Sequence, residues 1–206
     1  MTAAVRFRPE RDGEQAAVRA VVEDAFGDPV VGALVDGLRA SPDWIDGMSF
    51  VAEADGRTVG HVLFTRSLLD APPRLVDVLV LSPLSVAKDH QGRGIGSGLV
   101  RHGLEQAARR PEPLVFLEGS PRYYPRFGFE PGGSLGFRRP SLRIPEPAFQ
   151  VFRQPSYEPW MTGTLVYSRV FWDLDCVGLR GAELPAATGP TVETVARPEG
   201  FEPPTT

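Results

Sequence analysis

The feature that most constrains this sequence is an almost continuously apolar run at residues 75–81, which is followed by a glycine-rich turn. A strand that is apolar on both faces is typical of a sheet covered on both sides. A helical pattern then runs from Gly94 to about Arg109, and a second apolar strand follows at 114–117. Residues 75–118 are therefore predicted to form a strand–helix–strand unit with a right-handed crossover.

The N-terminal part begins with a short strand and continues with two amphipathic helical patterns. Residues 5–8 alternate between apolar and polar. Asp12 followed by Gln15 has the form of a capping box, with Asp12 as the N-cap of the first helix. Asp28 followed by Pro29 predicts the start of a second helix, with a cap and then proline at the first helical position.

The remaining elements are mostly strands. They are predicted from apolar or alternating runs at 49–54, 58–67, around Phe129, and 164–171. Asp55-Gly56 lies between the first two runs and is a strong hairpin signal. Residues 133–160 have no regular pattern and are predicted to be irregular. The fold class predicted is mixed α/β (α+β), with a central mixed sheet of about seven strands and helices on both faces.

The length and composition suit one soluble domain. The chain has 206 residues, and we expect a single domain over residues 1–180. Residues 181–206 are rich in proline, lack hydrophobic periodicity and are predicted to form a disordered C-terminal tail. No run of membrane-spanning length and no signal-peptide pattern is present in the sequence, so a cytoplasmic location and no membrane partner are predicted. The net charge of −4 gives no reason to expect a nucleic-acid partner.

Cysteine and histidine do not predict a metal site. Cys176 is the single cysteine, so an internal disulfide is excluded, and a small core residue is expected there. His61, His90 and His102 are predicted to lie on a strand, a loop and a helix, and none pairs with another at metal-ligand spacing. We therefore expect no metal.

The most informative segment is the glycine-rich turn before the predicted helix. Its residues are Gln91, Gly92, Arg93, Gly94, Ile95, Gly96 and Ser97. Alternating glycines leave the backbone bare, and a helix start offers unpaired N–H groups and a partial positive charge, so this turn could hold a diphosphate. The turn lacks the ending of a P-loop and does not fit G-x-G-x-x-G. A plain glycine-rich turn is the alternative, and the strand-to-helix context favours the phosphate site.

Two motifs make the sequence resemble a known family. Gln91-x-x-Gly94-x-Gly96 matches the Q/R-x-x-G-x-G/A signature of the GNAT superfamily of N-acetyltransferases. The segment 123–129, Tyr-Tyr-Pro-Arg-Phe-Gly-Phe, is similar to the aromatic segment that follows the fifth strand in that family. The particular residues of both motifs resemble those of the YhbS-like branch of the family. The resemblance covers about residues 5–172.

The resemblance implies how acetyl-CoA would be bound. A β-bulge is expected at Pro83 in the fourth strand, and it would splay strands four and five apart near Ser85 and Leu117. The backbone of Leu84, Ser85 and Val86 would pair with pantetheine. The turn from Gln91 to Ser97 would hold the diphosphate, with Arg93 as a charged donor, and the thioester would lie in the gap.

The resemblance also implies catalytic roles. Tyr124 matches the family's general acid toward the CoA sulfur, since a phenol stays protonated at neutral pH. A core aromatic is the alternative for Tyr124, and Tyr123 is expected mainly to pack. Glu118 ends the fifth strand and is the candidate base, with an exposed strand-end carboxylate as its alternative. Glu146 is a weaker candidate, and a water chain could serve instead.

The function implied is transfer of the acetyl group of acetyl-CoA to a primary amine by direct attack in a ternary complex. An acyl-CoA-binding sensor or regulatory module of the same fold is the alternative. The acceptor is open between a small-molecule amine and a protein amine, and a homodimer is also open. The long segment 132–160 carries aromatic and basic residues, so we expect it to form a flap that shapes acceptor choice.

Overall fold

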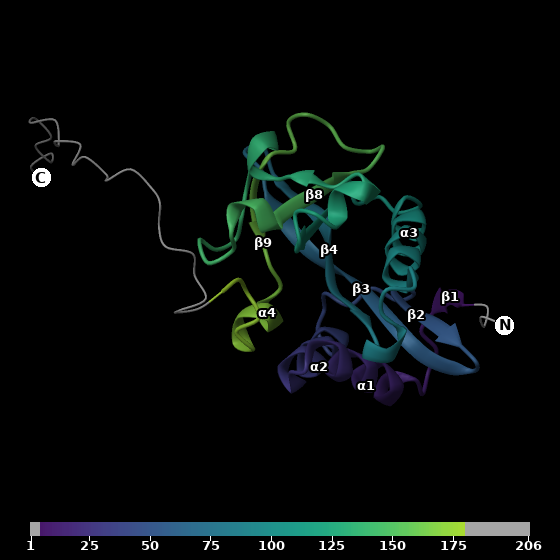
Figure 1. Ribbon diagram of the computed structural model, residues 1–206. Coiled ribbons are helices and arrows are strands. Elements are labelled where there is room, and N and C mark those ends of the chain that lie inside the picture. The colour runs from purple at the N-terminus through teal and green to yellow at the C-terminus, as the bar shows by residue number, and fades with distance from the viewer. Residues whose placement is uncertain (1–4, 180–206) are drawn as a thin grey trace, which may run out of the picture.

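The computed structural model describes residues 5–179, and the predicted tail at 181–206 lies outside this range (Figure 1). Within it, nine strands form one mixed sheet in the order β1-β2-β3-β4-β5-β8-β6, and β9 pairs with both β3 and β7. The strands are β1 Arg6–Pro9, β2 Ser49–Ala54, β3 Arg57–Asp70, β4 Leu75–Val86, β5 Leu114–Glu118, β6 Glu130–Pro131, β7 Phe137–Arg138, β8 Phe149–Arg153 and β9 Gly163–Val166. The mixed fold class is confirmed, with nine strands where about seven were predicted.

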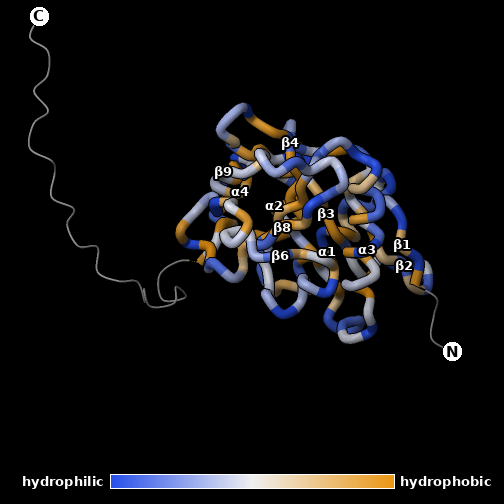
Figure 2. The backbone as a smooth tube through the Cα atoms, turned by 90° about the horizontal axis from the view of Figure 1, so that it is seen from above, coloured by the Kyte–Doolittle hydropathy of each residue, from blue (hydrophilic) through white to orange (hydrophobic). Residues whose placement is uncertain are grey.

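Helices cover both faces of the sheet, as predicted. The helices are α1 Gln15–Phe26, α2 Pro29–Arg39, α3 Ile95–Ala107 and α4 Arg169–Asp173. Side chains of α1, α2 and α4 pack into one apolar core, and those of α3 pack into a second core on the other side. Hydrophobic residues are concentrated in the middle of the molecule (Figure 2). No helix among the described residues is long and apolar enough to cross a membrane.

The starts of the first two helices differ in how well their sequence signals predict them. The Asp28 carboxylate accepts a hydrogen bond from the Val30 N–H at 2.9 Å, so the predicted cap of α2 is confirmed. The predicted capping box of α1 is wrong, because Glu14 occupies the N-cap position. The Glu14 carboxylate accepts a hydrogen bond from the Arg11 N–H at 2.8 Å and another from the largely buried Arg8 guanidinium. Glu14 therefore stabilises the turn before α1, the role that was predicted for Asp12.

The β2–β3 hairpin confirms the turn signal. Asp55 and Gly56 both have positive φ, 49° and 71°, as a tight two-residue turn requires. Strand β3 continues past the predicted end to Asp70, because its last residues pair with β9 as well as with β4.

Strand β4 contains the predicted bulge. Leu81 lies opposite Phe64 and Leu84 lies opposite Val62, so Ser82 and Pro83 together face a single residue of β3. The parallel pairing of β4 with β5 is limited to two positions, Leu79 with Val115 and Val80 with Phe116. The two strands therefore part just where the bulge begins.

Two predictions for the C-terminal half are wrong. Residues 149–153, expected to be irregular, form β8 and pair antiparallel with the whole of β5. The last strand ends at Val166 and is followed by α4, whereas a strand to residue 171 was expected. The rings of Tyr167 and Phe171 stack at 4.8 Å at helical spacing, and this contact places both side chains in the core beside α2.

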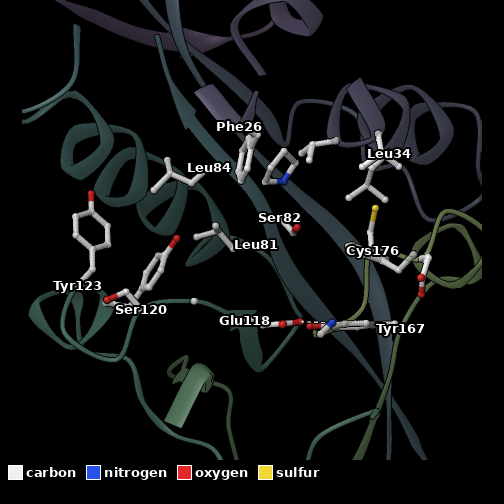
Figure 3. A pocket seen from close by; sticks show the side chains of 18 residues that line it. Phe26, Leu34, Leu81, Ser82, Leu84, Glu118, Ser120, Tyr123, Tyr167 and Cys176 are labelled. Carbon is white, nitrogen blue, oxygen red and sulfur yellow. Dashed lines mark hydrogen bonds between the residues drawn. The ribbon is translucent and has the colours of Figure 1, made fainter. Parts of the chain in front are cut away.

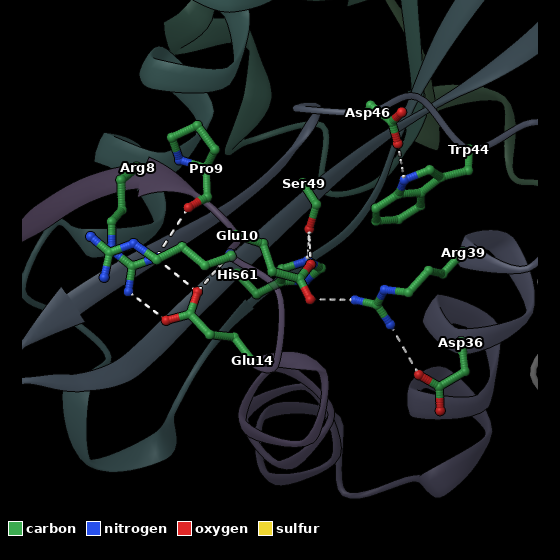
Figure 4. A network of polar contacts seen from close by, with 11 residues as sticks. Arg8, Pro9, Glu10, Glu14, Asp36, Arg39, Trp44, Asp46, Ser49 and His61 are labelled. Carbon is green, nitrogen blue, oxygen red and sulfur yellow. Dashed lines mark hydrogen bonds and ion pairs between the residues drawn. The ribbon is translucent and has the colours of Figure 1, made fainter.

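A polar network joins β2, β3 and the residue that follows β1 to α2 (Figure 4). Ser49 Oγ donates to Glu10 Oε2 at 2.5 Å and lies 2.9 Å from His61 Nε2. The other Glu10 oxygen accepts from Arg39 Nη2 at 2.6 Å. Because His61 is fully buried, this chain of contacts ties α2 to the centre of the sheet.

Candidate active site

A cavity of about 550 Å³ opens where β4 and β5 part (Figure 3). Its walls come from the β4 bulge, the end of β5, the aromatic segment after β5, the α1–α2 region and the stretch 167–178. Segments far apart in the sequence thus meet around the gap that the bulge creates. Tyr124 and Glu118, the two residues proposed as general acid and candidate base, both line this cavity.

Tyr124 begins a short 3₁₀ turn, Tyr124–Phe127, and is partly buried in an aromatic cluster. Its ring meets those of Tyr123 and Phe129 edge-on, at 5.0 Å and 5.7 Å between centroids. A Cβ atom at position 119 would overlap the Tyr124 ring, so glycine is needed there. Burial raises the pKa of the Tyr124 hydroxyl, and it stays a proton donor at neutral pH.

Glu118 is not the exposed strand-end carboxylate considered as an alternative. It is partly buried, and its Oε2 accepts a hydrogen bond from the Gly178 N–H at 3.2 Å. Burial raises the pKa of Glu118, although this hydrogen bond and the charge of Arg143 act in the opposite direction. Glu118 also contributes to raising the pKa of the buried Tyr167, which lies beside it in the cavity (Figure 3).

Glu146, the weaker candidate base, lies elsewhere. Its carboxylate is paired with Arg139 and is not among the groups that line the cavity. Within residues 5–179 there is no group of three His, Cys, Asp or Glu side chains that could hold a metal ion.

The glycine-rich turn forms a second cavity of about 300 Å³ at the start of α3. Gly92 and Gly94 have positive φ, 72° and 79°, and a Cβ atom at either position would meet no atom within 4 Å. The backbone here therefore faces open space, as a site for a bulky anion requires. The Gln91 side chain donates to the Val86 carbonyl at 3.0 Å and braces the turn.

The predicted binding residues fall into two adjoining places. Val86, Gln91, Gly92, Gly94, Ile95, Gly96 and Ser97 line the cavity at the turn, and Leu84 lines the larger cavity. Ser85 is buried between them on β4. Beyond Val80, no described residue of β5 pairs with β4. The backbone of residues 84–86 on the side of β4 that faces β5 is therefore not paired with β5 and can pair with another partner.

Arg93 does not lie where it was predicted, and Arg126, for which no role was predicted, lies there instead. The Arg93 guanidinium donates to the Asp89 carbonyl at 2.7 Å and does not line the cavity at the turn. Arg126 does line it, and its guanidinium lies 4.8 Å from the centroid of the Tyr123 ring. The sequence did contain a signal for Arg126, since it belongs to the same aromatic segment as Tyr124.

Tyr123 joins the two cavities, because it lines both. Its hydroxyl lies 3.4 Å from Ser97 Oγ at the start of α3. A role limited to packing was expected for Tyr123, and its place between the cavities goes beyond that expectation.

Two further residues or segments differ from what the sequence suggested. Cys176 is partly exposed and lines the larger cavity, although a core position was predicted. The segment 132–160 contributes no side chain to that cavity; the wall far from the turn comes from α1, α2 and residues 167–178. Neither contribution has a local sequence signal, because both depend on how distant segments pack.

Comparison with known proteins identifies the family. The family model described as an acetyltransferase (GNAT) domain matches residues 6–132. A protein of Escherichia coli K12 named as the uncharacterized N-acetyltransferase YjhQ is 36% identical over 130 residues, which cover 63% of this chain and 71% of YjhQ.

Two solved structures agree with this match over most of the chain. The E. coli GNAT family N-acetyltransferase YhbS, in complex with CoA, has a TM-score of 0.72 and 26% identity, covering 83% of this chain and 92% of YhbS. A GNAT family acetyltransferase from Brucella melitensis, in complex with acetyl-CoA, has a TM-score of 0.65 and 30% identity, covering 82% of this chain and 99% of that one. The resemblance seen in the two motifs is confirmed: this chain belongs to the GNAT family of acyl-CoA-dependent N-acetyltransferases.

Proposed function

We propose that this protein transfers the acetyl group of acetyl-CoA to a primary amine by direct attack in a ternary complex. The observation that carries the proposal is the cavity at the β4–β5 gap, which contains Tyr124 and Glu118 and adjoins the glycine-lined cavity through Tyr123. This is the order of parts that the reaction needs: a phosphate site, a gap for the thioester, a proton donor and a carboxylate.

The proposed path of the cofactor follows the two cavities. The diphosphate binds the bare N–H groups between Gly92 and Ser97, at the positive end of α3. Pantetheine runs along the free edge of 84–86, and the thioester reaches the gap. The CoA and acetyl-CoA complexes of the two similar structures support this choice of ligand.

The chemistry follows from the two side chains in the larger cavity. An ammonium has no lone pair, so the acceptor must first lose a proton, to Glu118 directly or through a water molecule. The amine nitrogen then attacks the thioester carbonyl, the C–N bond forms and the C–S bond breaks. The leaving thiolate takes the hydroxyl proton of Tyr124, whose pKa is raised by burial, and the nitrogen loses its extra proton to the resulting phenolate as the amide forms.

Thiol release by Tyr124→Phe tests the proposal. The substitution keeps the aromatic packing and removes the proton, so kcat is expected to fall about 100-fold or more while the KM for acetyl-CoA changes little. Tyr157→Phe is the matched control, since Tyr157 lies outside both cavities. Thiol release measured with a panel of amines gives these constants.

An unchanged kcat in Tyr124→Phe would contradict the assignment of the general acid. The sensor alternative predicts a different outcome, in which calorimetry shows CoA binding but the wild-type protein releases no thiol with any amine. If neither CoA nor acetyl-CoA bound at millimolar concentration, the phosphate site itself would be refuted.

A further inference from the structure

The larger cavity has an acceptor end with a distinct chemical character. Apart from the β4 bulge and the aromatic segment after β5, its apolar lining comes from Phe26, Val30, Val31, Leu34 and Phe171. Phe26 and Leu34 lie across the cavity from Glu118 and Tyr167 (Figure 3). A molecule that reached Glu118 from this end would therefore rest most of its body on apolar and aromatic groups.

The charged groups at this end are carboxylates. Of the 18 described residues that line the cavity, two are acidic, Glu118 and Asp175, and none is Lys, Arg or His. Arg143 is the nearby cation, and its Nη1 donates to Asp175 Oδ1 at 2.9 Å. Asp175 is thus paired with Arg143, whereas Glu118 accepts from the Gly178 N–H and feels Arg143 only through its charge, so Glu118 is the carboxylate that we assign to an acceptor ammonium.

Negative charge also acts on the thiol of Cys176. Burial raises its pKa, and the negative charges of Asp28 and Asp175 raise it further. Cys176 lines the cavity between the α2 wall and the Glu118 region (Figure 3). A carboxylate on the acceptor would meet this negative field with no basic side chain in the lining to pair with it.

We propose that the acceptor is a small monoamine of the 2-arylethylamine class, with an aromatic body, one ammonium group and no carboxylate. This inference rests on the proposed function and names the substrate class of the same site. The ring lies against Phe26, Leu34 and Phe171, and the ammonium lies toward Glu118. The second carboxylate of the lining, Asp175, is paired with Arg143 and so is less suited to a polyamine's second ammonium, and the lining has no basic side chain for the carboxylate of an amino acid.

Four amines separate these alternatives in the thiol-release assay. Burying a phenyl ring favours 2-phenylethylamine over ethylamine, so its kcat/KM is expected to be about tenfold higher or more. Phenylalanine differs from 2-phenylethylamine by its carboxylate and is expected to be roughly 100-fold worse. Putrescine, a diamine without an apolar body beyond its methylenes, is expected to be close to ethylamine. A higher kcat/KM for putrescine or phenylalanine than for 2-phenylethylamine would overturn the proposal.

A variant at Phe26 tests where the ring lies. Phe26 ends α1 and is 50% exposed, so its truncation should leave the fold intact. Phe26→Ala is expected to reduce the ratio of kcat/KM for 2-phenylethylamine to that for ethylamine about fivefold or more. Leu75→Ala, another exposed apolar residue and one outside the cavity, should leave the ratio unchanged. An unchanged ratio in Phe26→Ala would overturn the placement of the ring.

Binding measured on the complex with CoA distinguishes the two proposals. If no amine supports thiol release but calorimetry still shows 2-phenylethylamine binding more tightly than ethylamine and phenylalanine, the acceptor class stands and the transfer chemistry is wrong. If thiol is released but 2-phenylethylamine has no advantage, the transfer stands and the acceptor class is wrong.

Discussion

At the scale of single residues, the site depends on where a side chain points more than on which motif contains it. Arg93 lies in the glycine-rich signature, yet its guanidinium is used on the Asp89 carbonyl. Arg126 lies 33 positions further along the chain and lines the cavity at the turn. We therefore propose that the charged contact with the diphosphate is made by Arg126, a residue outside the signature.

Truncating each arginine tests this assignment. Arg126→Ala is expected to weaken CoA binding about tenfold, since a charge-assisted contact to phosphate contributes roughly 1.5–3 kcal/mol. Arg93→Ala should weaken it less, because the lost bond is internal to the turn. Calorimetry with CoA on both variants gives the comparison. A larger loss in Arg93→Ala would restore the role predicted from the signature.

At the scale of elements, α3 is positioned by glycines on the face that meets the sheet. A Cβ atom at Gly98 would overlap the Phe7 ring, and one at Gly103 would overlap the Phe64 ring. The helix can therefore lie close to β1 and β3, and its N-terminus is held at the cavity formed by the glycine-rich turn.

Gly103→Ala should therefore destabilise the protein. Alanine favours a helix by roughly 1 kcal/mol over glycine, but overpacking against Phe64 costs about 1–3 kcal/mol, and we expect a net loss of about 1 kcal/mol. Gly32→Ala in α2 is the matched control, because the atoms nearest to the added Cβ belong to the flexible side chain of Glu23 and not to an aromatic ring. Urea unfolding measures both. Equal free energies of unfolding for the two variants would contradict the close packing of α3.

At the scale of the whole molecule, the polar network around His61 links the sheet to α2. His61 Nε2 lies 2.9 Å from Ser49 Oγ, whose hydroxyl donates to Glu10, so the neutral ring with a proton on Nε2 fits this network. Among the described residues Nδ1 has no partner. Burial, with a contribution from the charge of Arg39, lowers the pKa of His61 to about 3.

This buried histidine predicts an acid-sensitive fold. The folded state keeps His61 neutral down to about pH 3, whereas the unfolded chain takes up the proton below about pH 6.5. Stability is therefore full above pH 6.5 and falls as the pH drops toward 3, by about 2 kcal/mol between pH 7 and pH 5 from this group. Urea unfolding at both pH values should show a smaller loss in His61→Gln. The same loss in both proteins would refute this role.

The strand–turn–helix–strand unit and its glycine-rich turn could be predicted from the sequence, and so could the β2–β3 hairpin, the α2 cap and the bulge at Pro83. All of these are set by residues that are neighbours in the chain, through backbone conformation and hydrophobic periodicity. The family resemblance, which rests on the turn and on the segment around Tyr124, is local in the same sense.

Only the tertiary structure decided the rest. Strand β8 exists because β5 offers an edge to pair with, and its five residues carry too short a pattern to predict. Glu118 becomes a partly buried carboxylate because Gly178 and Tyr167, 60 and 49 positions away, lie against it. The apolar wall of the larger cavity likewise combines α1, α2 and residues 167–178. Such features depend on contacts between distant segments, and these contacts form only when the whole chain packs.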